Sequence, residues 1–184
     1  MRIPLLIIVS ILCSCNGLGD RKSLPPLLFA DCAEADPAIQ IVTADHELFK
    51  VSFPSYWMNE PVGEGVRLRS AEFSDGWPRI FTLARVPFQE EKMQGSEDDF
   101  HRFEHGTFND HKAIWLIEND RDPHDDGTVM WHSEIRVAAG DEMYLIAMER
   151  RHDRNTEPDW CDFAPMIGSL VLKEKDHESH AIGE

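Results

Sequence analysis

Residues 129–148 decide the fold, and they read Val-Met-Trp-His-Ser-Glu-Ile-Arg-Val-Ala-Ala-Gly-Asp-Glu-Met-Tyr-Leu-Ile-Ala-Met. Two strand-forming segments, Val129–Val137 and Met143–Met148, lie on either side of Gly140-Asp141. Glycine beside aspartate between two such segments is typical of the tight turn of a β-hairpin. We therefore predict an antiparallel pair of strands here and expect the rest of the sheet to form around it.

Further segments show the period-2 alternation or the apolar runs of strands. These are residues 48–53, 66–73, 80–86, 113–117 and the short segment 170–172. An acidic stretch, 120–127, is predicted as the loop that leads into residue 129. Strands in runs, with helices kept apart from them, indicate an α+β domain. We expect a largely antiparallel sheet of about six to seven strands.

Two segments are predicted as the main helices. Ser96-Glu97-Asp98-Asp99 has the form of a capping box, and phenylalanines at 100, 103 and 108 follow at near-helical spacing. The second helix spans residues 158–167, where Pro158 suits a first turn and Pro165 is expected to cut the helix short.

The start of the chain has the features of an export signal. Arg2 precedes an apolar run, Leu5–Leu12, which is too short to cross a bilayer. Leu12-Cys13-Ser14-Cys15 then resembles the lipobox of bacterial lipoproteins. The resemblance implies cleavage after Ser14, lipid on Cys15 and, from Asn16, a location at the outer membrane facing the periplasm. A plain secretory signal is the alternative, because Cys13 departs from the usual lipobox.

Composition supports an anchored protein that does not bind nucleic acid. The formal net charge is −16, which repels nucleic acid and anionic headgroups, so we expect the lipid and not a basic patch to hold the protein at the membrane. We predict a signal peptide at 1–14, a lipid-anchored tether at 15–38, a single α+β domain at 39–175 and a flexible tail at 176–184.

Two cysteines remain once Cys13 and Cys15 are assigned to the signal and the lipid. Cys32 and Cys161 allow one connectivity, and an exported protein meets conditions in which they can pair. Two separate buried thiols are the alternative.

The two ends of the predicted domain resemble a known superfamily. Residues 49–57, Phe-Lys-Val-Ser-Phe-Pro-Ser-Tyr-Trp, look like the opening strand and Pro-x-x-Trp turn of PsbP-like domains. Residues 163–170 are similar to the final helix and strand of that superfamily and of DcrB-type lipoproteins. The resemblance implies an α/β/α sandwich and no catalytic residues.

Histidines and acids supply two candidate metal sites. His101, Glu104 and His105 spell H-x-x-E-H, which on a helix would place both imidazoles on one face, as in inverted zinc peptidases. An exposed face of an amphipathic helix is the alternative. Asp120, Asp122 and Asp126 are weak candidate ligands for a hard cation, but the loop breaks the EF-hand pattern and a solvated hairpin loop is the favoured interpretation.

These features predict a non-enzymatic envelope lipoprotein that acts as a binding or assembly module. We expect no cofactor, a membrane contact through the lipid and a protein partner in the envelope. Two alternatives stay open, a metal-dependent hydrolase centred on His101, Glu104 and His105, and a cation-binding structural protein that uses the acidic loop.

Overall fold

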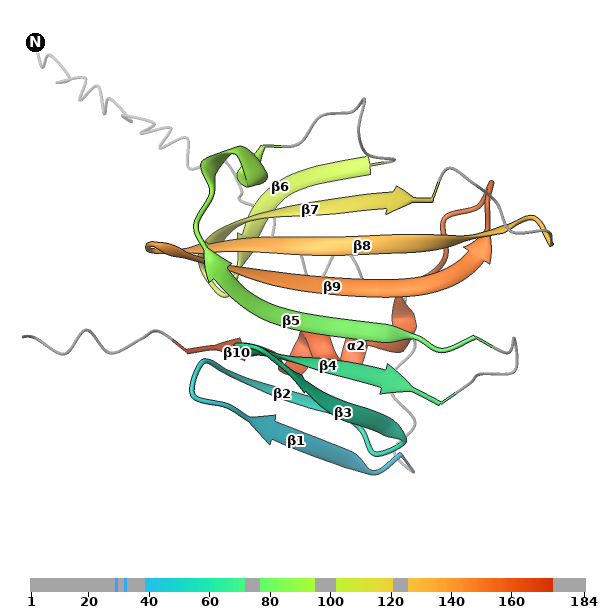
Figure 1. Ribbon diagram of the computed structural model, residues 1–184, viewed down its shortest axis with the longest axis horizontal. Helices are drawn as coiled ribbons and strands as arrows, with labels where there is room; N and C mark the ends of the chain where they lie inside the picture. The colour runs from blue at the N-terminus through green and yellow to red at the C-terminus, as the bar shows by residue number, and fades with distance from the viewer. Residues whose placement is uncertain are drawn as a thin grey trace, which may run out of the picture.

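The structure is a computed structural model that describes residues 29, 32, 39–71, 77–94, 102–120 and 126–173 (Figure 1). The predicted signal peptide and tail lie outside these residues, as does all of the predicted tether before residue 39 except Phe29 and Cys32. The division into four segments therefore stays a prediction.

A seven-stranded antiparallel sheet forms the body of the protein. Its spatial order is β3-β4-β5-β9-β8-β7-β6. The strands are β3 (Trp57–Val62), β4 (Gly65–Ser70), β5 (Ile80–Pro87), β6 (Arg102–Phe108), β7 (His111–Asn119), β8 (Thr128–Ala139) and β9 (Glu142–Asp153). The predicted hairpin is the pair β8–β9, and Gly140 in its turn has a φ of +63°, a conformation that glycine adopts at little cost.

One long connection sets this strand order. After β5 the chain passes through a 3₁₀ helix, η1 (Glu90–Met93), and enters the sheet again at its far edge as β6. It then returns strand by strand until β9 lies beside β5. Residues of β5 are thereby placed next to residues that lie more than fifty positions later in the sequence.

A second sheet of three strands packs below the first (Figure 1). It contains β1 (Ile41–Asp45), β2 (Phe49–Pro54) and β10 (Val171–Leu172), all antiparallel. The chain passes from β2 in this sheet to β3 in the larger one through Ser55 and Tyr56. The sequence analysis predicted one sheet, so this division was not foreseen.

The core lies between one face of the large sheet and the small sheet with the helix α2 (Ala164–Ser169), which Figure 1 shows behind β4 and β5. We call this covered face the inner face. The Phe163 ring contacts Trp57 with centroids 5.7 Å apart. The largest fully buried side chains of this core include Trp131, Phe49, Phe81, Phe108 and Phe163.

The prediction of a helix from residue 96 to 108 was wrong for the part that the structure describes. Residues 102–108 form the edge strand β6, which pairs with β7 over its whole length. Phe103 pairs with Leu116 and lies on one face, while Phe108 lies on the other and is buried in the core. Pairing with β7 therefore overrides the near-helical spacing of the phenylalanines. The capping-box residues lie outside the described part.

The expectation of two main helices in an α/β/α sandwich was also wrong. The described residues hold one α-helix, α2, which follows a short 3₁₀ turn, η2 (Cys161–Phe163). Pro165 is the second residue of α2 and lies in its first turn, where its missing N–H costs nothing, so the proline does not cut the helix short. The mostly antiparallel sheet was predicted correctly.

Cys32 and Cys161 form a disulfide with their Cα atoms 5.3 Å apart. The bond ties the segment before β1 to η2, beneath the large sheet. Two buried arginines hold the same turn, because Asp162 accepts a hydrogen bond from Arg79 at 3.0 Å and lies 3.4 Å from Nη1 of Arg150.

Tyr144 connects the two sheets at the opposite end. Its hydroxyl donates to the carbonyl oxygen of Lys173 at 3.1 Å and lies 3.3 Å from that of Leu48. Burial raises the pKa of this phenol because the charged form loses its hydration. The small sheet and the large sheet are thus joined by a polar contact as well as by the core.

Candidate functional surface

The second face of the large sheet is the candidate functional surface, and we call it the outer face. Among the described elements only η1 packs on it, where Met93 covers Ile114, Leu116 and Met143. Cross-strand partners in neighbouring antiparallel strands share a face, so the register shows which side chains lie together there. Three rows of side chains cross β4, β5, β9 and β8.

The central row consists of Arg67, Thr82, Ala147 and Glu134. Across these four strands a guanidinium lies at the β4 end and a carboxylate at the β8 end, with two small side chains between them. Glu60 of β3 is the cross-strand partner of Arg67 on its other side. Glu134 pairs through Oε1 with Arg136 of its own strand. Neighbouring strands lie about 4.8 Å apart, so the two charged ends of the row are about 14 Å apart.

A second row lies toward the chain's 120–127 loop and consists of Arg69, Ile80, Glu149 and His132. It continues to Glu118 in β7. The imidazole of His132 lies 3.8 Å from Glu149 and 4.0 Å from Asp120. Acidic groups of β7, β9 and the residue after β7 therefore surround His132, and an arginine again occupies β4.

The third row consists of Gly65, Ala84, Leu145 and Arg136. Nη1 of Arg136 donates to the carbonyl oxygen of Lys92 in η1 at 2.7 Å, so this row borders the covered part of the face. Gly65 leaves the β4 end of the row without a side chain.

The arginines of β4 differ from the other arginines of the large sheet. Neither Arg67 nor Arg69 forms an ion pair with any residue that the structure describes, whereas Arg79, Arg85, Arg136 and Arg151 all do. Nε of Arg67 is buried without a hydrogen-bond partner among these residues. A buried donor left unsatisfied costs about 1–3 kcal/mol.

One end of the outer face carries an aromatic and charged cluster. The Arg151 guanidinium lies 3.8 Å from the ring centroid of Trp77, and its Nη2 lies 2.9 Å from Asp126. Oδ1 of Asp126 also accepts from the hydroxyl of Thr128 at 2.7 Å. The hydrogen bond from this hydroxyl is the main reason why the pKa of Asp126 lies below its usual value.

The structure does not assemble the predicted zinc motif as the sequence analysis expected. Glu104 pairs with Trp115 and His105 with Ile114, so the two side chains lie on opposite faces of the edge strand β6. His101 lies outside the described residues. The zinc-site prediction assumed that these residues form a helix, so the H-x-x-E-H spacing no longer supports it.

The acidic loop is described only at its ends. Asp122 lies outside the described residues, Asp120 lies near His132, and Oδ1 of Asp126 is engaged with Thr128 and Arg151. Within the described part of the chain, histidine, cysteine, aspartate and glutamate form no group of three that is placed to hold a metal ion. Cys15 also lies outside that part, and no described helix is long and apolar enough to span a membrane.

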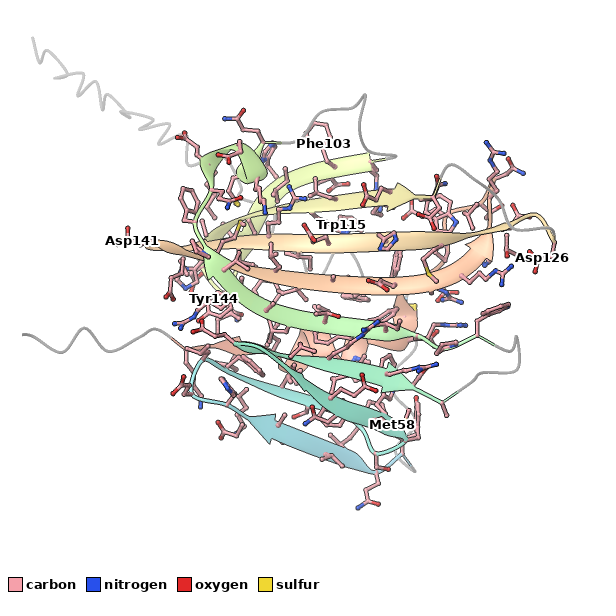
Figure 2. The ribbon with its side chains drawn as sticks, in the orientation of Figure 1. Met58, Phe103, Trp115, Asp126, Asp141 and Tyr144 are labelled. Carbon is pink, nitrogen blue, oxygen red and sulfur yellow. A yellow bond between two sulfur atoms is a disulfide. The ribbon has the colours of Figure 1, made fainter. Side chains whose placement is uncertain are left out.

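The sequence analysis did not identify Arg67, Arg69 or Glu134. The alternation in 66–73 already placed both arginines on the polar side of a strand, and the polar positions of 129–137 include Glu134. Only the pairing of β5 with β9 brings the two segments into one row. Figure 2 shows the side chains of this sheet, with Met58 at the β3 edge and Phe103 at the β6 edge.

Comparison with known proteins identifies the fold alone. No family model and no curated protein matches the sequence. A crystal structure from Bacteroides thetaiotaomicron VPI-5482 is similar, with a TM-score of 0.50 and 10% identity over 74% of this chain and 49% of that one. The chain thus spans about half the length of the Bacteroides protein.

Two further solved structures have lower scores. The Ran-binding protein Mog1p of Saccharomyces cerevisiae has a TM-score of 0.45 and 9% identity, over 74% of this chain and 97% of Mog1p. LpqN of Mycobacterium tuberculosis, which is involved in cell envelope biogenesis, has a TM-score of 0.41 and 10% identity, over 84% of this chain and 99% of LpqN.

Proposed function

We propose that the protein is a non-enzymatic binding module of the bacterial cell envelope and that it binds its partner through the outer face. The arrangement of Arg67, Thr82, Ala147 and Glu134 carries this proposal. In this row an arginine and a glutamate lie on either side of two small side chains. The backbone groups of the four strands are already hydrogen-bonded to one another.

Such a surface suits the recognition of a second surface better than chemistry on a small molecule. The strands hold the charged groups in fixed register, so little conformational freedom is lost when a partner binds. Complementary charges then select the partner and its orientation. Arg67 and Arg69 form no ion pair with a described residue, so their guanidinium groups can pair with a partner's carboxylates.

The sequence supports a location at the envelope. Cys15 ends the lipobox-like segment, and the Cys32–Cys161 disulfide fits an oxidising compartment. Cys32 follows Cys15 by 32 − 15 = 17 positions, so an extended segment reaches at most about 60 Å from the lipid to the disulfide. In this proposal the domain stays close to the membrane that holds its anchor.

Photo-crosslinking tests the binding surface. We expect Thr82→p-benzoylphenylalanine, at the centre of the outer face, to yield crosslinked adducts when cells that express the full chain are irradiated. Thr43→p-benzoylphenylalanine, on the exposed strand β1 of the small sheet, is the matched control. Equal yields from the two positions, or none from Thr82, would remove the outer face from the proposal.

Lipid labelling tests the anchor. We expect Cys15→Ser to abolish the incorporation of labelled palmitate and to move the protein from the membrane fraction to the soluble fraction, because a serine hydroxyl does not replace the thiol that carries the lipid. Cys13→Ser is the control, since the predicted cleavage removes residue 13 and labelling should persist. Membrane association that survives Cys15→Ser would contradict the lipid anchor.

A further inference from the structure

We propose that the partner bound at the outer face is a second copy of this chain, related to the first by a two-fold axis that runs along the seam between β5 and β9. The inference rests on the proposed function, because it assigns an occupant to the same surface. It follows from the order of charges in the three rows of the outer face.

The central row is complementary to itself. In the order β4, β5, β9, β8 it reads Arg67, Thr82, Ala147, Glu134, and its midpoint lies between β5 and β9. A two-fold axis along that midpoint places β4 of one copy over β8 of the other. Arg67 then faces Glu134 of the second copy, and Thr82 faces Ala147. The symmetry repeats both contacts, as in any isologous interface.

The adjacent rows agree with the same axis. Arg69 comes to lie over His132 of the second copy, between the carboxylates of Glu118 and Glu149. In the third row Gly65 comes to lie over Arg136, whose Nη1 donates to Lys92 of η1, so the contact ends at this row, where η1 covers the outer face. Like charges do not oppose one another directly in any of the three rows.

Sheet geometry permits this contact. Two sheets that pack face to face keep their strands within about 30° of each other and lie about 10 Å apart, an arrangement that an axis parallel to the strands produces. The middle of the contact lies on β5 and β9. Thr82, Ala84 and Ala147 are small there, while the larger side chains of Ile80, Leu145 and Glu149 flank them in the adjacent rows. Long charged side chains lie to either side and can bridge the gap.

Local charges on the outer face favour a second copy, although the net charge does not. The chain has a formal net charge of −16, so association of two copies is opposed at long range. Salt near 0.15 M screens this repulsion beyond about 8 Å but leaves direct contacts largely intact. The arginines of β4, which lack ion pairs within the described residues, supply the local attraction.

Charge reversal in the full chain tests the inference. We expect the wild-type chain to show concentration-dependent dimers by sedimentation velocity at 0.15 M salt. Arg67→Glu and Glu134→Arg should each weaken dimerisation at least tenfold, because each sets two like charges against each other at both symmetric contacts. Arg154→Glu makes the same charge change as Arg67→Glu at an exposed turn outside this face and should leave the dimer unchanged.

Mixing the two variants gives the decisive result. A dimer of one Arg67→Glu chain with one Glu134→Arg chain has opposite charges at both contacts, so the mixture should regain wild-type dimerisation. The double variant Arg67→Glu/Glu134→Arg should dimerise by itself for the same reason. A monomeric wild type, equal weakening by Arg154→Glu, or a mixture that stays monomeric would overturn the inference.

Failure of this inference is distinguishable from failure of the proposed function. Adducts from position 82 that contain two copies of this chain support the dimer. Adducts that contain only other proteins contradict the dimer but leave the outer face as the binding surface. Circular dichroism and thermal unfolding of each variant identify any loss of association that results from misfolding.

Discussion

Replacing both Cys32 and Cys161 by serine is expected to lower the free energy of unfolding by about 4–5 kcal/mol. The disulfide closes a loop of 129 positions, and a crosslink over so long a loop restricts the unfolded chain strongly. The same change frees η2, which carries Asp162, from the segment before β1. Urea unfolding at equilibrium measures the difference.

The comparison requires a background in which Cys13 and Cys15 are serine, so that no other thiol can react. In that background the chain with an intact disulfide should unfold at higher urea than the same chain after reduction. The reduced chain and the double serine variant should then agree. A double variant as stable as the oxidised chain would show that the contacts of Arg79 and Arg150 with Asp162 hold η2 without the covalent bond.

Replacing Gly65 by alanine is expected to lower the free energy of unfolding by about 2–4 kcal/mol. An added Cβ atom would lie 2.1 Å from the carbonyl oxygen of Leu83 and 2.9 Å from Cα of Ala84. Both are backbone atoms of the neighbouring strand β5, so no side-chain rotation relieves the clash. The pairing of β4 with β5 must distort, and the melting temperature should fall by roughly 4–16 °C.

Gly168→Ala provides the matched control. Gly168 lies in α2, and an added Cβ there meets no atom within 4 Å. Alanine favours a helix more than glycine does, so this variant should be as stable as the wild type or gain about 0.5–1 kcal/mol. If the two alanine variants unfold at the same temperature, β4 does not approach β5 as closely as the structure shows.

The strands that follow local alternation could be predicted from the sequence. Residues 48–53 correspond to β2 and residues 80–86 to β5, and the turn at Gly140 lies where its composition placed it. A period of two is a property of neighbouring residues, so it survives whatever packs on the strand. Strands β1 and β3 show weaker alternation of apolar and polar residues and were harder to predict, because β1 is largely exposed and β3 is an edge strand that contains a proline.

The local sequence pattern did not show that residues 102–108 form a strand. Its phenylalanines fit a helix about as well as a strand, and the decision came from β7, which offers a full row of backbone partners and a core position for Phe108. Strand pairing is a contact between distant segments, so no local pattern contains it. The zinc hypothesis for Glu104 and His105 depended on this segment and lost its premise with it.

By itself the sequence determined which segments alternate and the acidic net charge, and it predicted that Cys32 and Cys161 pair once Cys13 and Cys15 are assigned to the signal and the lipid. The tertiary structure alone decided that Arg67 and Glu134, which are 134 − 67 = 67 positions apart, lie at the two ends of one row. The physical reason is the long connection after β5, which lets β9 pair with β5. The sequence shows that each strand carries its charged residue. The two residues lie in one row of the outer face only once β9 has paired with β5.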